Sequence, residues 1–247
     1  MTTAASHLPS EILQHASATE LHTAVHALNP RVAVFDCDGT LWAPDSGSGF
    51  MRWTIETGLI SPKSIAWLNQ RYARYNRGEV NELAICGEMV QVYAGLQVEE
   101  LRRAAASYFE KFIAASIFLE MAQLVTDLQA RGVEIWAVSS TNDWVVEEGL
   151  RRFNVPADRT LCARVAIEGG VVTDRILAVP TDQGKVTALN GAGITHPDAV
   201  FGNSIHDAAM LSIARCAFPI NPSPALVERS AQESWRVYYP SLIRAIE

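Results

Sequence analysis

The chain has 247 residues, of which 49% are hydrophobic and 19% charged, and its formal net charge is −7. This composition supplies enough apolar side chains for a buried core, which excludes an intrinsically disordered protein. The negative charge and the absence of a basic run weigh against nucleic acid or an anionic membrane surface as the main partner. No segment approaches the roughly 20 apolar residues of a membrane-spanning helix.

The four cysteines are far apart in the sequence and form no CxxC pair. A disulfide framework or a cysteine zinc site is therefore not expected, and Cys37 is expected to face the core. Free thiols suit a reducing compartment, and the first 30 residues have no pattern of a secretory signal. We therefore predict a cytoplasmic protein.

Residues 1–30 are predicted to form two short helices, with Ser10 and Thr19 as candidate N-caps. His22 and His26 are four residues apart, which places both on one side of a helix. A metal site would need a further ligand, and the sequence suggests none. A polar helix face is the preferred interpretation of these two histidines.

The apolar run 32–35 (VAVF) predicts a buried strand, and Asp36 and Asp38 follow it directly. Residues two apart on an extended segment point to one side, so both carboxylates are expected at the carboxyl edge of a sheet. Two close carboxylates repel each other unless a cation neutralises them, and Mg²⁺ prefers such hard oxygen ligands. One carboxylate could attack phosphorus and the other could move a proton. Gly39 permits a sharp turn, and the hydroxyl of Thr40 could fix the first carboxylate.

The segment 36–40, Asp-Cys-Asp-Gly-Thr, resembles the DxDGT motif of the haloacid dehalogenase-like (HAD) superfamily, on its phosphatase side. The resemblance implies an α/β fold: a Rossmann-like three-layer core with a mostly parallel sheet and an inserted α-helical cap. The core is expected at residues 1–45 and 115–247, and the cap at 46–114. A long helical insertion at this point is similar to the cap of the phosphoserine phosphatase-like group.

The remaining elements are predicted from periodicity and from turn residues. A loop at 43–49 precedes a helical stretch over 50–118, with breaks near 58–62, 78 and 95. The core elements that follow are a helix at 115–131, a strand at 133–138, a helix at 143–153, a hairpin of strands at 161–166 and 171–172, a helix after Asp182, a strand at 199–201, a helix at 207–214 and a strand at 217–220.

Two later segments carry candidate phosphate ligands. Ser139 and Ser140 follow a predicted strand, with Asn142 as a candidate helix N-cap, and helix N-termini bind anions readily. The stretch VSSTN resembles HAD motif II. Lys185 opens a predicted helix, where a lysine is unfavourable for the helix dipole. It resembles motif III, which implies that it neutralises charge on the phosphoryl group.

The segment 201–207 resembles motif IV, the GDxxxD form, with one departure. Asn203 stands where the first acid is usual, and its amide oxygen can coordinate Mg²⁺ without adding charge. We therefore expect weaker metal affinity, but not loss of the site. His206 is interpreted as incidental. The resemblance implies Mg²⁺ as cofactor, held by Asp36, Asp38, Asn203 and Asp207.

These motifs together predict a Mg²⁺-dependent phosphomonoester hydrolase that forms a phosphoaspartate on Asp36, with Asp38 as proton donor and acceptor. The substrate is expected to be a small phosphate ester. Asp45 lies where phosphoserine phosphatases carry an acid that meets the substrate amine, and Met89 falls where they carry a carboxylate-reading arginine. A phosphorylated amino alcohol such as phosphocholine or phosphoethanolamine is therefore favoured over phosphoserine.

Three aromatic residues, Trp42, Phe50 and Trp53, are candidates to bind the cationic group of such a substrate by cation–π contact. Packing of the cap against the core is the favoured alternative for them. A phosphotransferase or mutase on the same fold stays open, as does a catalytically weak phosphate-binding module. A haloacid dehalogenase is disfavoured because it does not need Asp38. The sequence does not indicate an oligomeric state.

Overall fold

The computed structural model describes residues 15–244, so the candidate cap Ser10 lies outside the described residues. A six-stranded sheet has the order β5-β4-β3-β2-β6-β7, and all its pairs are parallel except β4 with β5. The predicted α/β class with a mostly parallel sheet is confirmed. The strands are β2 (Val32–Phe35), β3 (Glu134–Asn142), β4 (Thr160–Glu168), β5 (Val171–Ala178), β6 (Ala199–Gly202) and β7 (Cys216–Pro219).

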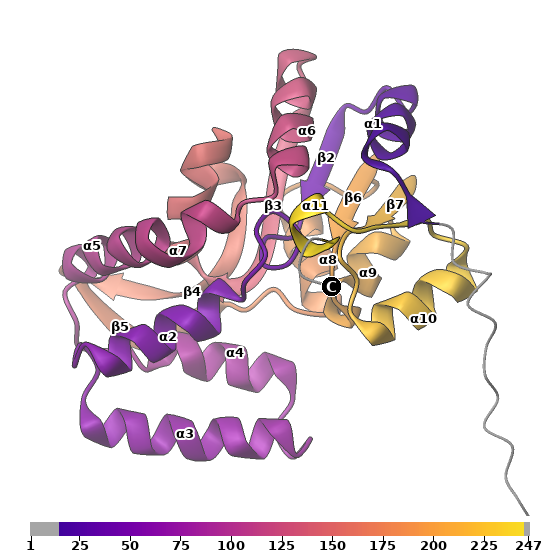
Figure 1. The fold of residues 1–247 in the computed structure, drawn as a ribbon. Coiled ribbons are helices and arrows are strands. Elements are labelled where there is room, and N and C mark those ends of the chain that lie inside the picture. The colour runs from indigo at the N-terminus through magenta and orange to yellow at the C-terminus, as the bar shows by residue number, and fades with distance from the viewer. Residues whose placement is uncertain (1–14, 245–247) are drawn as a thin grey trace, which may run out of the picture.

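Helices cover both faces of this sheet (Figure 1). Successive side chains of β2 enter different hydrophobic clusters, as the alternation of a strand requires. Ala33 and Phe35 pack with α1 (Ala18–Ala27), α6 (Leu119–Ala130) and α7 (Asp143–Leu150). Val34 packs with α8 (Gln183–Gly191), α9 (Ala208–Ser212) and α10 (Pro224–Glu233). These layers place the end of β2 at the centre of the molecule.

Four helices occupy the stretch between β2 and α6: α2 (Ser46–Glu56), α3 (Pro62–Asn76), α4 (Glu82–Gln91) and α5 (Val98–Tyr108). The turns between them contain Gly58, Gly78 and Gly95, each with a positive φ that favours glycine. In Figure 1, α2, α3 and α4 lie together at the lower left, on the opposite side of the molecule from α1. A π-helical turn, Phe109–Ile113, leads from α5 back toward the core.

Aromatic rings hold the inserted helices together and against the core. Phe50 of α2 packs on Tyr93 and Tyr108, with ring centroids 5.7 and 5.4 Å apart, and Tyr93 meets Trp144 of α7 edge to face at 5.6 Å. Buried aromatic pairs of this kind dominate the packing energy of a small core. Phe50 therefore packs the inserted helices against the core, which is the alternative that the sequence analysis favoured for it.

Several element boundaries differ from the sequence predictions. The N-cap of α1 is Ser17, which forms a capping box with Glu20, so Thr19 is not the cap. The helix predicted to begin at 115 begins at Leu119, because a 3₁₀ turn at Ala114–Ser116 ends in two extended residues, Ile117 and Phe118, which backbone bonds hold against the loop after β2. β3 continues to Asn142, through a register shift that the apolar run did not reveal.

The small elements near the chain ends were not predicted. β1 (His15–Ala16) pairs in parallel with β8 (Val237–Tyr238), and α11 (Ser241–Arg244) follows. Strands of two residues have no measurable period, so only the tertiary contact defines them. No helix in the described part of the chain is long and apolar enough to cross a membrane.

Candidate active site

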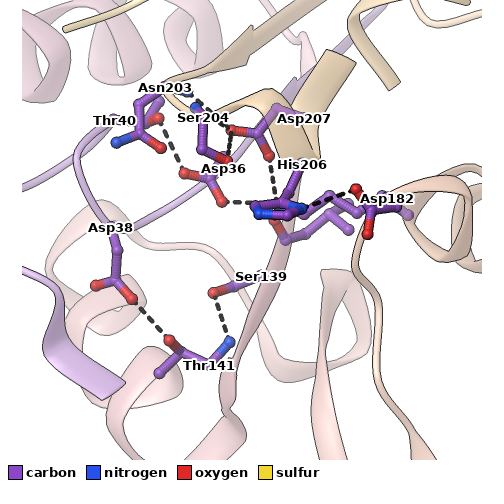
Figure 2. Close-up of polar contacts among 12 residues, drawn as sticks. Asp36, Asp38, Thr40, Ser139, Thr141, Asp182, Asn203, Ser204, His206 and Asp207 are labelled. Carbon is purple, nitrogen blue, oxygen red and sulfur yellow. Dashed lines mark hydrogen bonds and ion pairs between the residues drawn. The ribbon is translucent and has the colours of Figure 1, made fainter. Parts of the chain in front are cut away.

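The polar centre of the molecule lies where β2 ends (Figure 2). Asp36 is buried, and its Oδ1 lies 2.8 Å from Nζ of Lys185, which also lies 2.5 Å from Oδ1 of Asp207. The Lys185 ammonium completes its coordination with the carbonyl oxygen of Val138 at 3.1 Å. Thr40 donates its hydroxyl to Oδ2 of Asp36 at 3.0 Å, as predicted. One lysine therefore lies between two buried carboxylates.

The parallel sheet brings these groups together. β2 lies between β3 and β6, so Asp36 leaves the sheet beside Val138 on one side and the loop after Gly202 on the other. Lys185 approaches from the first turn of α8, and Asp207 from the turn before α9. Residues that are widely separated in sequence thus meet at one edge of the sheet, as expected for open α/β folds.

Burial and charge control the protonation of this cluster. Burial raises the pKa of Asp36 to about 7, and the negative charge of Asp207 adds to this effect while Lys185 opposes it. Burial disfavours the charged form of Lys185, but the carboxylates of Asp207 and Asp36 outweigh it and raise the lysine pKa. Lys185 is therefore a permanent cation beside a carboxylate whose charge depends on its neighbours.

Asp38 is held in a fixed orientation by three donors. Its Oδ1 accepts from Nε1 of Trp42 at 2.6 Å and from the backbone N–H of Ser46 at 2.9 Å, and its Oδ2 accepts from Oγ1 of Thr141 at 2.7 Å. Burial raises the pKa of Asp38, as does the charge of Asp45, while the bonds from Ser46 and Thr141 oppose the shift. A carboxyl held in this way is placed to give a proton to a bound substrate and to accept one from water.

The loop after β6 surrounds Asp207. Its Oδ2 accepts from the backbone N–H groups of Asn203 and Ser204, each at 2.9 Å, and from Oγ of Ser204 at 3.3 Å. With Lys185 on Oδ1, both carboxylate oxygens have protein partners. The side chain of Asn203 lies against Gly39, where a Cβ would come within 1.9 Å of Nδ2. Asn203 therefore faces the cavity and Asp207 supports it from behind.

A cavity of about 340 Å³ opens over these residues. Its floor includes Asp36, Asp38 and Asn203, and its wall includes Ser139 and Ser140. Ser139 accepts from the backbone N–H of Thr141, and Asn142 caps the N-terminus of α7 as predicted, accepting from Val145 at 3.1 Å. The inserted helices supply the roof, which comprises Asp45, Tyr72, Tyr75, Glu82, Ile85, Cys86, Met89 and Val90.

Two of the aromatic residues assigned to the substrate are buried away from the cavity. Trp42 and Phe50 are fully buried, and Trp42 instead donates to Asp38. Trp53 stacks on Phe50 with ring centroids 6.1 Å apart and lines a hollow that adjoins the cavity, with Asp45, Ser48 and Tyr72 common to both. Packing covers the faces of Trp42 and Phe50, so the structure contradicts a cation–π role for these two rings and agrees with the packing alternative that the sequence favoured; for Trp53 that role stays a prediction. Asp45 does line the cavity, while it also caps α2 through Ser48.

Sequence reasoning missed the roof residues Tyr72, Tyr75 and Glu82. The hydroxyl of Tyr75 donates to Oε2 of Glu82, and the two tyrosine rings lie 5.9 Å apart. His206, interpreted as incidental, has Nε2 at 3.7 Å from Glu82 and Nδ1 at 2.8 Å from Asp182. It therefore links the inserted helices to the core. The three-residue spacing of the tyrosines on one helix was the available signal.

Comparison with known proteins agrees with this geometry. The family model described as haloacid dehalogenase-like hydrolase matches residues 33–212, which include every predicted catalytic and metal residue. The chain belongs to this family of hydrolases, and the predicted superfamily and enzyme class are confirmed.

Individual relatives are more distant. The histidinol-phosphatase of Neisseria meningitidis serogroup C (strain 8013) is 22% identical over 215 residues, which cover 83% of this chain and 97% of that protein. A solved structure of a protein with unknown function from Bordetella pertussis Tohama I has a TM-score of 0.75 at 25% identity, and the match covers 85% of this chain and 98% of that one. A solved structure of a phospho-aspartyl intermediate analogue of phosphoserine phosphatase has a TM-score of 0.58 at 16% identity, and the match covers 88% of this chain and 97% of that one.

Proposed function

We propose that the protein is a Mg²⁺-dependent phosphatase that hydrolyses phosphate monoesters of small amino alcohols through a phosphoaspartate on Asp36. The observation that carries the proposal is the contact of Asp36 with Lys185 at 2.8 Å, beside a cavity that also exposes Asp38. A nucleophile, a fixed cation and a proton-transfer group are the parts that phosphoryl transfer requires.

The protein groups divide the reaction between them. Asp36 attacks phosphorus in line, so that a bond forms to its carboxylate oxygen while the ester bond breaks. Asp38 gives its proton to the leaving alkoxide, and then takes a proton from the water that hydrolyses the acyl phosphate. Ser139 and Ser140 bind the phosphoryl oxygens, and Lys185, whose ammonium already contacts three protein acceptors, neutralises charge on Asp36 and on the nearby phosphoryl group. Trp42 and Thr141 keep Asp38 in place for both proton transfers.

The donor set fits Mg²⁺. Carboxylate, backbone carbonyl and amide oxygens gather at the cavity floor, and such hard oxygens are what Mg²⁺ prefers. Asp36, the backbone carbonyl of Asp38 and the amide oxygen of Asn203 would hold the ion. Asp207 would orient the loop, since protein donors already occupy both its oxygens. The ion would supply charge neutralisation for the carboxylate and the phosphate.

The roof of the cavity suggests the chemistry of the leaving group. The lining includes the carboxylates of Asp45 and Glu82 and the rings of Tyr72 and Tyr75, but neither an arginine nor a lysine of the described residues. A substrate carboxylate would find no permanent cation there, only His206, which is charged only when protonated, whereas an ammonium or imidazolium group would find two carboxylates. We infer that helices α2–α5, the cap expected at 46–114, recognise this cation and exclude water during the reaction.

The relative from Neisseria meningitidis bears the name histidinol-phosphatase. Histidinol phosphate is itself a phosphorylated amino alcohol that has no carboxylate, so it belongs to the class that the cavity favours. It joins phosphocholine and phosphoethanolamine as a candidate substrate. The prediction of a cytoplasmic enzyme accords with small metabolites of this kind and stays a prediction.

Activity on p-nitrophenyl phosphate tests the proposed nucleophile. We expect Mg²⁺-dependent turnover by the unaltered protein and none by Asp36→Asn, because an amide is not a nucleophile toward phosphorus. Retained turnover in that variant contradicts the assignment. Activity that depends on an added alcohol acceptor, with little transfer to water, would instead identify a phosphotransferase.

A substrate panel with Glu82→Gln tests the proposed leaving group. We expect kcat/KM for histidinol phosphate, phosphocholine or phosphoethanolamine to exceed that for phosphoserine. Loss of the Glu82 charge should raise KM for the cationic ester about tenfold, as loss of a charged hydrogen bond implies, and leave p-nitrophenyl phosphate unaffected. Glu99→Gln, an exposed glutamate of α5, is the matched control. A preference for phosphoserine refutes the proposed substrate class.

A further inference from the structure

Three side chains that commonly bind metal meet outside the active site, between α1 and α6. They are His22, His26 and Asp127, and one ligand atom from each lies within 4.8 Å of the others. The two histidines are one helical turn apart on α1, and α6 supplies the carboxylate. Ligand atoms around tetrahedral Zn²⁺ are about 3.3 Å apart for bonds of about 2.0 Å. Small side-chain rotations would therefore close the site around an ion.

Hydrogen bonding around His22 suits a metal ligand. Its Nε2 lies 3.2 Å from the backbone carbonyl oxygen of Glu120. Because a carbonyl can only accept, Nε2 carries the proton and the lone pair of Nδ1 is available. A histidine that donates its second N–H to a backbone carbonyl is the usual arrangement around protein-bound metals, where the bond fixes the tautomer and the ring orientation.

The other two side chains have unused acceptor atoms. Nδ1 of His26 is buried and has no hydrogen-bond partner within residues 15–244. A buried polar nitrogen without a partner is costly, and a bound cation would satisfy it. Gln123 donates to Oδ1 of Asp127 at 2.8 Å, which orients the carboxylate and leaves Oδ2 for an ion. The two histidine rings lie edge to face, 6.1 Å apart.

An open hollow beside the histidines gives access from solvent; it is lined by Ala18, Thr19, His22, Thr23, His26, Ala27, Leu119, Glu120 and Gln123.

We propose that His22, His26 and Asp127 bind one divalent transition metal of the zinc class, with water as the fourth ligand. Two imidazoles and one carboxylate suit Zn²⁺ better than Mg²⁺, because imidazole is the softer ligand. The ion cross-links the first helix of the described chain to α6 and so stabilises their packing. This site is separate from the Mg²⁺ site, and it stands whether or not the proposed phosphatase function holds.

Cobalt absorption tests the site in full-length protein that has no histidine tag. After chelator treatment, Co²⁺ is titrated in excess Mg²⁺, which occupies the oxygen ligands of the active site. We expect one equivalent of Co²⁺ to give the intense visible bands of tetrahedral coordination, and Zn²⁺ to displace it. His26→Gln and Asp127→Asn should each weaken binding about tenfold or more. Two variants should keep the bands: His196→Gln, an exposed histidine on another loop, and Asp36→Asn.

Circular dichroism shows whether each variant is folded, and p-nitrophenyl phosphate turnover confirms it for every variant except Asp36→Asn, which is expected to be inactive. Zn²⁺ should also raise the melting temperature of the unaltered protein and not that of His26→Gln. If His26→Gln does not fold, His22→Gln takes its place in the titration. Absence of tetrahedral Co²⁺ bands, or bands that survive both His26→Gln and Asp127→Asn, overturns the proposal, as does loss of the bands in Asp36→Asn.

Discussion

Trp42 offers a sharp test of how the structure sets up proton transfer. Its Nε1 donates to Oδ1 of Asp38 at 2.6 Å, one of three bonds that orient this carboxylate. Trp42→Phe removes that donor and keeps most of the ring that meets Phe109 edge to face at 5.3 Å. A hydrogen bond to a charged group contributes about 1.5–3 kcal/mol. If the bond acts in the transition state, kcat should fall about 10- to 150-fold with little change in KM.

The pH profile gives a second readout of the same change. A carboxylate that loses a donor binds its proton more tightly, so the pH-rate limb governed by Asp38 should move to higher pH. Thr141→Val removes another donor, Oγ1 to Oδ2 at 2.7 Å, almost without change of shape, and should move the limb the same way. Steady-state kinetics between pH 5 and 9 on p-nitrophenyl phosphate would measure both effects.

A packing control separates the hydrogen bond from the lost volume. Phe153 is buried against Trp42, with ring centroids 6.3 Å apart, and it is not one of the three residues that donate to Asp38. Phe153→Leu should cost stability and leave kcat within about twofold. The reasoning is refuted if kcat of Trp42→Phe stays within twofold of that of the unaltered protein, or if it falls no further than kcat of Phe153→Leu.

Three further predictions concern the backbone, the metal and pH. Gly39→Ala should lower the free energy of unfolding by about 1–2 kcal/mol because of its φ of +76°, and it should also lower activity because the added Cβ displaces Asn203. Gly58→Ala, at φ +73° and with no neighbouring atoms, should lower the free energy of unfolding without changing activity; urea unfolding and turnover measure the two effects. Asn203→Asp adds charge to the metal ligands, so the Mg²⁺ concentration for half-maximal activity should fall about tenfold; a rise would contradict the assignment. Burial raises the pKa of Asp143 to about 6, despite the charge of Arg164, so the folded state binds this proton more tightly than the unfolded state. Stability from Asp143 is therefore lost as pH rises from about 4 to about 6, and Asp143→Asn should gain about 1–3 kcal/mol over the unaltered protein at pH 8 but nothing at pH 4; equal differences at both pH values would exclude this cause.

The sequence alone determined the framework and the chemistry at the sheet edge. Val32–Phe35 is a strand with the predicted bounds, because a short apolar run before two aspartates and a glycine has few other stable conformations. The helical insertion with its glycine breaks, and the turn chemistry of Thr40 and Asn142, also followed from local patterns. Such features depend on neighbours in the chain, which a single sequence displays.

Only the tertiary structure decided what each aromatic ring and each histidine contacts. Trp42 donates to Asp38, Tyr75 donates to Glu82 in the roof of the cavity, and Asp127 joins the two histidines of α1. Each of these pairings depends on how one helix is placed against another, and that placement is set by the sum of many small packing contacts. No local pattern encodes it, so residue type predicted the chemistry available and the fold selected the partners.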